Sequence, residues 1–315
     1  MGLKNQSSME QVTEFILTSF QLPRHLELIL FVVLLVVFLI TVAGNITIIT
    51  LVCLDQRLQT PMYFFLCNLS LMEVFFVTSI IPKMLVDMVS LNKVISFFGC
   101  VAQCYFYFFF GASETILLAV VAFDHYVAIC KPLRYAIIMN EWVCIDLVLG
   151  CWIGGFLAPA APIILLYPLS FCGSNIIDHF FCDYTPVVKL SCSDVQALLA
   201  LENVLCSVML LGSLFVTLLS YVYIIGTILC MHSTKGRQKT FSTCASHITV
   251  ASIFYGSSII MYALPSQGYS QDVQMGLAVL TGVVTPLLNP FIYSLRNEKV
   301  KEAFKDCLKK RKFTL

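Results

Sequence analysis

Seven long stretches with almost no charged residues limit this chain to a membrane protein. Five contain no Asp, Glu, Lys or Arg at all, and they lie between Glu27 and Asp55, Asp146 and Asp178, Glu202 and Lys235, Lys239 and Asp272, and Asp272 and Arg296. Two more, residues 58–82 and 94–123, hold one acid each, Glu73 and Glu114. A helix needs about 20 apolar residues to cross the hydrocarbon core of a bilayer. We therefore expect an all-α membrane protein, a seven-transmembrane helix bundle.

The composition agrees with this fold class. Only 12% of the residues are charged, against about 25% in a soluble domain, so lipid replaces water around most of the surface. The first 27 residues are polar, and the apolar run after them is too long for a signal peptide. We expect a single domain: an outer segment over 1–25, the bundle over about 26–295, and a tail over 296–315.

The distribution of lysine and arginine predicts the orientation. With the N-terminus outside, fourteen of the nineteen basic residues fall on the cytoplasmic side and four on the outer side, as the positive-inside rule requires. Asn5 begins an Asn-Gln-Ser sequon, which can be glycosylated only on the luminal side. A multi-pass plasma membrane protein with an extracellular N-terminus is the expected arrangement.

The tail predicts a short amphipathic cytoplasmic helix after helix seven. Its apolar residues recur at helical spacing on one face, with lysines elsewhere: Val300, Ala303, Phe304, Cys307 and Leu308. Such a helix lies along the inner leaflet of the membrane. Cys307 is a candidate palmitoylation site, and a free apolar cysteine is an equally good interpretation.

Four of the fourteen cysteines are predicted at the outer, oxidising face: Cys100, Cys172, Cys182 and Cys192. Four cysteines allow three pairings, and the residues alone do not choose between them.

Several motifs lie on the cytoplasmic half of the predicted helices in a fixed order. They are Gly44-Asn45, the run Pro61 to Phe65, Asp124-His125-Tyr126 within the run 123–130, Ser220-Tyr221, the run Lys239 to His247, and the run Pro286 to Tyr293. Together they resemble an olfactory receptor, a rhodopsin-like G-protein-coupled receptor, over nearly the whole chain. The resemblance implies an odorant ligand, a heterotrimeric stimulatory G protein that raises cAMP, contact with membrane lipid, and no nucleic-acid partner.

The resemblance also implies roles for particular residues. It predicts disulfides Cys100–Cys182 and Cys172–Cys192. It assigns activation and coupling to Asp124, His125, Tyr126, Tyr221, Lys239, Asn289, Pro290 and Tyr293. Pro290 removes a helix hydrogen bond and weakens the helix locally, which suits a hinge; a static kink is the alternative.

One position departs from the family pattern. Where the family has Asp-Arg-Tyr, this chain has His125 after Asp124. Arginine is always charged and offers several donors, whereas histidine is often neutral. We expect the contact with the G protein to be weaker here.

Glu73 and Glu114 are the only carboxylates expected well inside the bundle. Acids in a membrane are costly and mark functional sites. The resemblance places them face to face, where two carboxylates share either a cation or a proton. A sodium ion, helped by oxygens of Asn45, Ser70 or Asn289, is one interpretation. The other is a protonated pair with no metal and no cofactor.

The expected ligand cavity lies in the outer half. Tyr107, Gly111 and Glu114 share a stripe of helix three, and the small residues Gly111 and Ala112 leave room beside Phe108. By family register the other lining residues are Leu205, Cys206, Met209, Tyr255, Ser258, Ile259, Tyr262 and Val279. Apolar and aromatic residues with a few hydroxyls are typical of small-molecule sites. They predict a neutral volatile ligand, with Glu202 either at the cavity or facing water.

Three other functions compete with odour detection. The same kind of receptor could sense a non-odour metabolite. A transporter could use Glu73 and Glu114 as a proton path, but no inverted repeat or pair of broken helices is evident. An enzyme is not expected, because no His-Glu-x-x-His, Gly-x-Ser-x-Gly or phosphate-binding glycine loop is present.

Overall fold

The computed structural model describes residues 12–18, 20, 22–171, 174–231, 233–263, 271–295 and 298–312. Its long helices are α1 (Arg24–Leu54), α2 (Pro61–Val89), α3 (Phe97–Cys130), α5 (Glu141–Leu157), α8 (Gln196–Leu229) and α9 (Thr234–Ser258). A last membrane segment is built from α10 (Gln271–Val279), the π-helix η5 (Leu280–Val284) and α11 (Thr285–Leu295), and α12 (Glu298–Lys312) follows it. The shorter elements are β1 (Glu14–Leu17), η1 (Gln56–Leu58), β2 (Val94–Ser96), η2 (Pro132–Arg134), α4 (Tyr135–Ile138), α6 (Ala160–Ile164), β3 (Ile176–Ile177), α7 (Tyr184–Val188) and the π-helix η3 (Ile259–Ala263).

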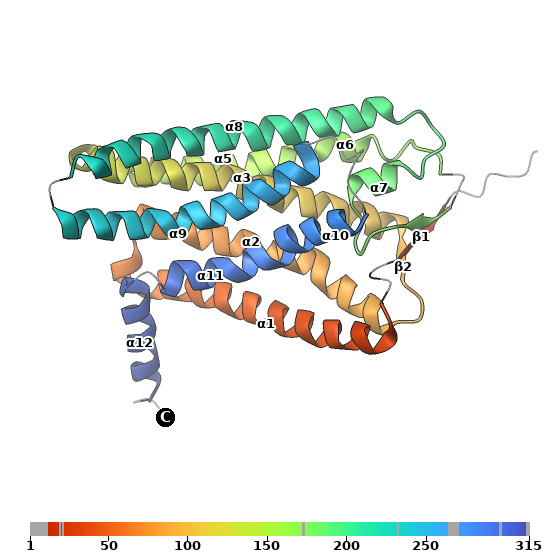
Figure 1. Ribbon diagram of the computed structural model, residues 1–315, viewed down its shortest axis with the longest axis horizontal. Coiled ribbons are helices and arrows are strands. Elements are labelled where there is room, and N and C mark those ends of the chain that lie inside the picture. The colour runs from red at the N-terminus through yellow and green to blue at the C-terminus, as the bar shows by residue number, and fades with distance from the viewer. Residues whose placement is uncertain are drawn as a thin grey trace, which may run out of the picture.

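The long helices run side by side as one bundle (Figure 1). Six segments in the described part of the chain are long and apolar enough to cross a bilayer. Helices α5 and α6 together form one of them, and α10, η5 and α11 form another. The shorter apolar segment His247–Ala263 makes the seventh crossing. The predicted seven-helix bundle is confirmed. A helix satisfies its backbone hydrogen bonds internally, which the water-free bilayer core demands.

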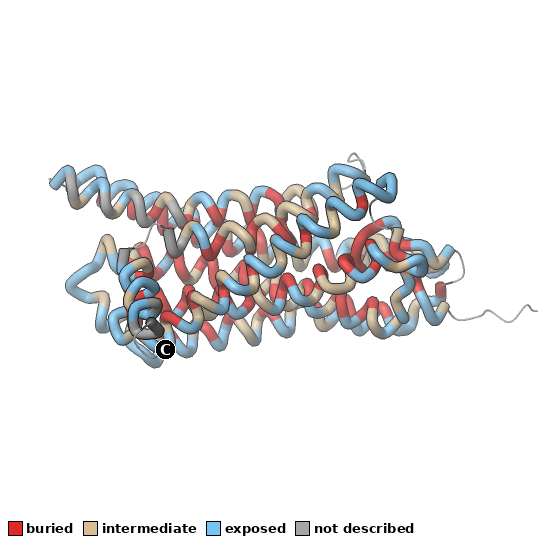
Figure 2. Tube along the Cα trace, turned by 90° about the horizontal axis from the view of Figure 1, so that it is seen from below, coloured by how far each residue is buried: buried red, intermediate tan, exposed pale blue. Residues whose placement is uncertain are grey.

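The exposed surface of the bundle is apolar, unlike that of a soluble protein, and the buried core is mostly apolar with a smaller polar set. Buried residues line the inner faces of the helices, and the outer faces are exposed (Figure 2). Many exposed side chains are large and apolar, such as Val32, Leu39, Phe215 and Val222, because these face lipid. The buried set includes Asn45, Glu73, Glu114, His125 and Asn289, so polar groups gather inside the bundle.

The end of the bundle that is predicted to face outside, here called the outer end, carries a small β-sheet that the sequence did not predict. Strand β1 is central, pairing antiparallel with β2 and parallel with β3. It connects the segment before α1 to the loop before α3 and to the long loop before α8. A second tie is ionic: Lys93 Nζ lies 2.7 Å from Glu27 Oε1, and Arg24 lies 2.9 Å from Glu27 Oε2.

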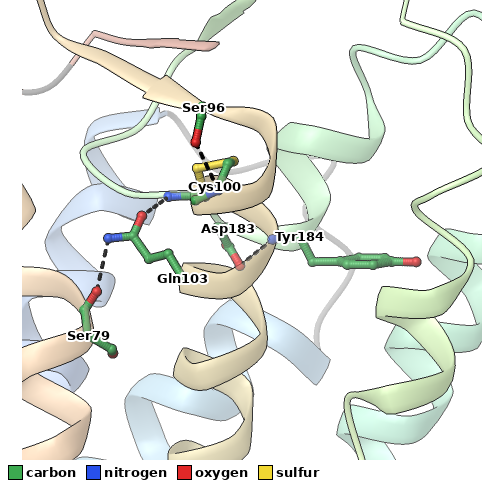
Figure 3. The surroundings of a disulfide bond; sticks show 8 residues. Ser79, Ser96, Cys100, Gln103, Asp183 and Tyr184 are labelled. Carbon is green, nitrogen blue, oxygen red and sulfur yellow. Dashed lines mark hydrogen bonds between the residues drawn. A yellow bond between two sulfur atoms is a disulfide. The ribbon is translucent and has the colours of Figure 1, made fainter. Parts of the chain in front are cut away.

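A disulfide between Cys100 and Cys182 anchors the long outer loop to α3, as the family resemblance implied. Gln103, one turn below, strengthens this anchor (Figure 3). Its amide donates to the Ser79 carbonyl at 3.0 Å and accepts from the Cys182 N–H at 3.0 Å. Gln103 therefore joins α2, α3 and the loop. Cys192 is also disulfide-bonded, but Cys172 lies outside the described residues, as does Asn5, so the Cys172–Cys192 pairing and the glycosylation site stay predictions.

Helix α12 lies at the end of the bundle opposite the β-sheet, the end predicted to face the cytoplasm, and runs across the direction of the long helices and away past α1 (Figure 1). Val300 and Ala303 are buried in the same apolar cluster as Leu51 and Leu58, while Phe304 and Cys307 are exposed. Arg57 Nη2 lies 2.8 Å from Asp306 Oδ2. The predicted apolar face is thus divided between the bundle and the surrounding membrane.

Close contact between α3 and α5 depends on Gly155. A Cβ atom added there would lie 1.9 Å from Ser113 Oγ, 2.7 Å from Ser113 N and 2.8 Å from the Phe109 carbonyl oxygen. Two of those atoms belong to the backbone, so a side chain would force the helices apart. Gly150, on the same helix, would place a Cβ with nothing within 4 Å.

We therefore predict that Gly155→Ala lowers the free energy of unfolding by about 1–3 kcal/mol, the usual cost of overpacking. Gly150→Ala is the matched control and should be neutral or slightly stabilising. Thermal unfolding of the purified protein, followed by a thiol-reactive dye that reads its buried cysteines, measures both. Equal melting temperatures for the two variants would contradict the packing argument.

Candidate functional site

A cavity of about 420 Å³ lies in the outer half of the bundle, between α3, α5, α6, α8 and α9. Nine of the twelve residues predicted to bind ligand line it: Tyr107, Phe108, Gly111, Ala112, Leu205, Cys206, Met209, Ser258 and Tyr262. The wall is mostly apolar, and its size falls within the usual range of roughly 300–1,000 Å³ for small-molecule sites. Glycine and alanine on α3 leave the space, as the sequence suggested.

The other three predicted residues do not line this cavity. The Tyr255 hydroxyl lies 3.3 Å from Thr217 Oγ1 and from the Thr115 carbonyl oxygen, so it joins α9 to α8 and α3. Ile259 packs against the buried apolar cluster that contains Tyr255 and Phe254. Val279 packs against another cluster, the one that contains Leu34 and Phe76. Ile259 begins η3, whose extra residue per turn rotates the register of a regular helix.

Several lining residues were not predicted from the sequence. They include Phe76, Thr115, Tyr184, Phe254 and Thr281, and a set from the α5–α6 corner, Gly154, Leu157, Ala158, Pro159, Ala161, Pro162 and Ile163. Glu202, which the sequence left undecided, also lines the cavity. Thr115 follows Gly111 by four residues, so its helical spacing was a usable signal. Tyr184 comes from the outer loop, where no periodicity applies. Its hydroxyl donates to the Pro162 carbonyl at 3.2 Å.

A tyrosine pair spans the cavity from α3 to the outer end of α9. The Tyr262 hydroxyl donates to the Tyr107 hydroxyl at 2.8 Å, and the Tyr262 ring meets Phe108 edge to face, with centroids 5.4 Å apart. Because the Tyr262 proton is used within the pair, the Tyr107 proton is the one left for a ligand. Tyr262 also lines a second, outer cavity of about 570 Å³ beside α7 and α8, and the pair stands near the boundary of the two cavities.

Polar side chains from four helices meet below the ligand cavity. Asn289 donates to Glu73 Oε1, and Glu73 interacts with both Asn45 and Glu114. Four buried oxygens here have no hydrogen-bond partner within the described part of the chain: Asn45 Oδ1, Glu73 Oε2, Glu114 Oε1 and Asn289 Oδ1. Carboxylate and amide oxygens are the ligands that hard cations prefer, so this set fits a sodium ion.

A second polar chain joins α3, α8 and α9 at the cytoplasmic end. The Tyr221 hydroxyl lies 3.3 Å from His125 Nδ1 and 2.8 Å from His247 Nδ1. The two imidazole rings meet edge to face, with centroids 5.4 Å apart. His125 is therefore buried between three helices, and His247 packs beside it.

The neighbours of His125 make separate contacts. Asp124 Oδ1 accepts from the Tyr135 hydroxyl at 2.8 Å, outside α3. Tyr126 lies under Lys131, whose Nζ is 5.6 Å from the ring centroid. The side chains of Lys239 and Tyr293 are not among those described, so their predicted roles are not placed. Pro290 lies inside α11, where a Cβ on Gly44 of α1 would come within 2.9 Å of the Pro290 Cβ.

Seven packed helices, an outer cavity under an anchored loop, and a polar chain at the cytoplasmic end define the class of seven-helix membrane receptors. A family model described as "Olfactory receptor" matches residues 34–311. The chain is 50% identical to human olfactory receptor 6C4, covering 94% of this chain and 96% of the relative, and 48% identical to human olfactory receptor 6J1, covering 94% and 85%. It is also 48% identical to rat olfactory receptor 287, covering 94% and 95%. The chain belongs to the olfactory receptor family.

Membership confirms the prediction made from the motifs: the chain is a multi-pass membrane receptor and not an enzyme. It also sets aside the transporter alternative, in which Glu73 and Glu114 would carry protons.

Proposed function

We propose that this receptor binds a small, neutral volatile in the outer cavity and activates a stimulatory G protein, which raises cAMP. It would act at the plasma membrane with its N-terminus outside, as the distribution of basic residues indicates. The observation that carries the proposal is the apolar wall of the cavity, with Tyr107 and Ser258 as hydroxyl donors. Burial would supply most of the affinity, at about 25 cal/mol per Å² of apolar surface.

The signal would travel along α3 and α9, because both helices line the cavity and both contribute a histidine to the His125–Tyr221–His247 chain. A ligand that favours a different packing of Tyr262 against Tyr107 would bias the position of α9. An outward movement of α9 would separate His247 from Tyr221 and open a cytoplasmic cleft. Arg237, exposed near the start of α9, can attract an acidic partner surface.

A cavity-filling substitution tests the ligand site. We predict that Gly111→Leu lowers the potency of any active volatile by about tenfold or more, because the added side chain occupies the cavity beside Phe76. Gly212→Leu is the control, since nothing lies within 4 Å of its Cβ position. A cAMP reporter screened with neutral volatiles and, separately, with water-soluble metabolites gives the readout at matched surface expression. Equal potency of the volatile at both variants would show that the cavity is not the ligand site.

The second proposal concerns sodium. Glu73, Glu114, Asn45 and Asn289 would hold the ion, which would offset one negative charge of the acid pair and favour the resting arrangement of α2, α3 and α11. We predict that replacing sodium by choline raises basal cAMP output by about fivefold, a typical coupling of ~1 kcal/mol. Glu114→Gln should abolish this dependence, whereas Ser113→Ala, one residue away and facing α5, should retain it. If the basal cAMP output of the wild type does not change when sodium is replaced, Glu73 and Glu114 are instead a protonated carboxyl pair with no metal.

The third proposal concerns coupling through His125. A neutral imidazole offers one donor where guanidinium offers five, and a charge-assisted hydrogen bond contributes about 1.5–3 kcal/mol. We predict weak cAMP output, and a gain of roughly tenfold for His125→Arg at equal surface expression. Ala128→Arg adds the same charge on the exposed face of α3 and should not raise output. A flat or reduced response from His125→Arg would show that this contact does not limit coupling.

A further inference from the structure

Glu202 is a buried carboxyl group at the boundary of the two outer cavities. It lies in the second turn of α8, is only 6% exposed, and lines both the 420 Å³ ligand cavity and the 570 Å³ cavity outside it. Its Oε2 accepts from Thr185 Oγ1 of α7 at 3.1 Å. Its Oε1 is buried and has no hydrogen-bond partner within the described residues. Glu202 therefore lines the cavity with one buried oxygen whose hydrogen-bonding capacity is unused.

The surroundings of Glu202 favour a neutral carboxylic acid. Among the described residues, no Lys, Arg or His nitrogen lies within 4 Å of its oxygens. Asp183 of the same loop is another acid, and its charge disfavours a charge on Glu202. Burial raises the pKa of Asp183 to about 7. Two carboxyl groups in one dry site hold at least one proton between them. Lys189 acts electrostatically on both acids, but it is exposed and forms no ion pair with either among the described residues.

The position of Glu202 suits a hydrogen bond to one end of a ligand. Beside it on α8, Leu205, Cys206 and Met209 form an apolar wall. A ligand whose apolar body lies along that wall has its polar end near Glu202 Oε1, on the α8 side of the cavity. The hydroxyl pair Tyr107–Tyr262 occupies another part of the wall. Glu202 and this pair can therefore hydrogen-bond to different atoms of the ligand.

We propose that Glu202, as the protonated acid, donates its O–H to an acceptor oxygen of the ligand, so that the receptor selects neutral ketones, aldehydes, esters or ethers. This inference rests on the proposed function, because it names the ligand class of the same cavity. A carboxyl O–H would be a further donor in this cavity, on the α8 side and apart from the hydroxyls of Tyr107 and Ser258. A buried hydrogen bond of this kind should change affinity by about tenfold. A primary amine of the same length would instead require an ionised Glu202 as its counter-charge.

The substitution Glu202→Gln separates these two chemistries. Glutamine keeps the shape and an N–H donor but cannot carry a negative charge, and Glu202→Leu keeps the size and removes the donor. Asn203→Leu is the matched control, because Asn203 is the next residue, is exposed and lines only the outer cavity. All variants are compared at equal surface expression, and as purified receptors in lipid nanodiscs.

Two measurements are needed. Infrared difference spectra of wild type against Glu202→Gln, without ligand, should contain the carbonyl band of a protonated carboxylic acid. Thermal stabilisation and cAMP output are then measured with eight-carbon probes: 2-octanone, octanal, methyl heptanoate, octane and octylamine. We expect the oxygen-bearing probes to bind about tenfold tighter than octane, Glu202→Leu to lose that advantage, and Glu202→Gln and Asn203→Leu to retain it within about threefold.

Each other outcome is decisive. A carboxylate band in place of the acid band, a preference for octylamine that Glu202→Gln abolishes, or an unchanged response in Glu202→Leu would overturn the proposal. Failure of every oxygen-bearing probe to stabilise the receptor would overturn the ligand class. Stabilisation by 2-octanone without any cAMP output would leave the Glu202 contact standing and count only against the proposed signalling function.

Discussion

The absence of water inside the bilayer governs the whole architecture. Every backbone N–H and C=O group in the hydrocarbon region must find a partner within the protein, which is why the crossings are helices. The same cost applies to side chains, so the polar ones turn inward. Glu73 and Glu114 lie at the centre, the His125–Tyr221–His247 chain at the cytoplasmic end, and Glu202 at the outer end. Few water molecules compete for these groups, so each becomes a place where a ligand, an ion or a proton changes the energy strongly.

The same requirement applies to the long outer loop, because part of its polar backbone is buried against the bundle. It crosses the mouth of the bundle, where Phe181, Cys182 and Tyr184 are buried. A buried loop needs partners for its polar backbone, and Gln103 supplies one to the N–H of Cys182. The Cys100–Cys182 disulfide holds the loop over α3. Together they place Tyr184 in the wall of the ligand cavity and Thr185 beside Glu202.

How much the sequence could predict differs between parts of the molecule. Charge-free runs identify the helices because the bilayer imposes a length, and they single out Glu73 as an acid inside one of them. The motifs place Asn289 and Tyr221 in their networks. Within a regular helix the spacing of Tyr107 and Gly111 also predicts the cavity wall, and the family resemblance supplies Met209. The prediction stops where the backbone is irregular: the π-helical turn at Ile259 changes the register, and Tyr184 comes from a loop. Glu202 was left undecided, because spacing alone does not tell whether a residue one turn inside a helix faces a cavity or water.

The central position of strand β1 in the outer sheet has a consequence for biogenesis. Residues 14–17 are made first, yet their partners at 94–96 and 176–177 follow about 80 and 160 residues later. Contacts so distant along the chain form slowly, since a long loop must close before they can stabilise anything. During synthesis one edge of this strand therefore has no partner until β2 follows, after two membrane crossings, and the other has none until β3 follows, after four. Exposed strand edges invite pairing with other chains, so we expect wrong pairing of the strand at this stage of synthesis.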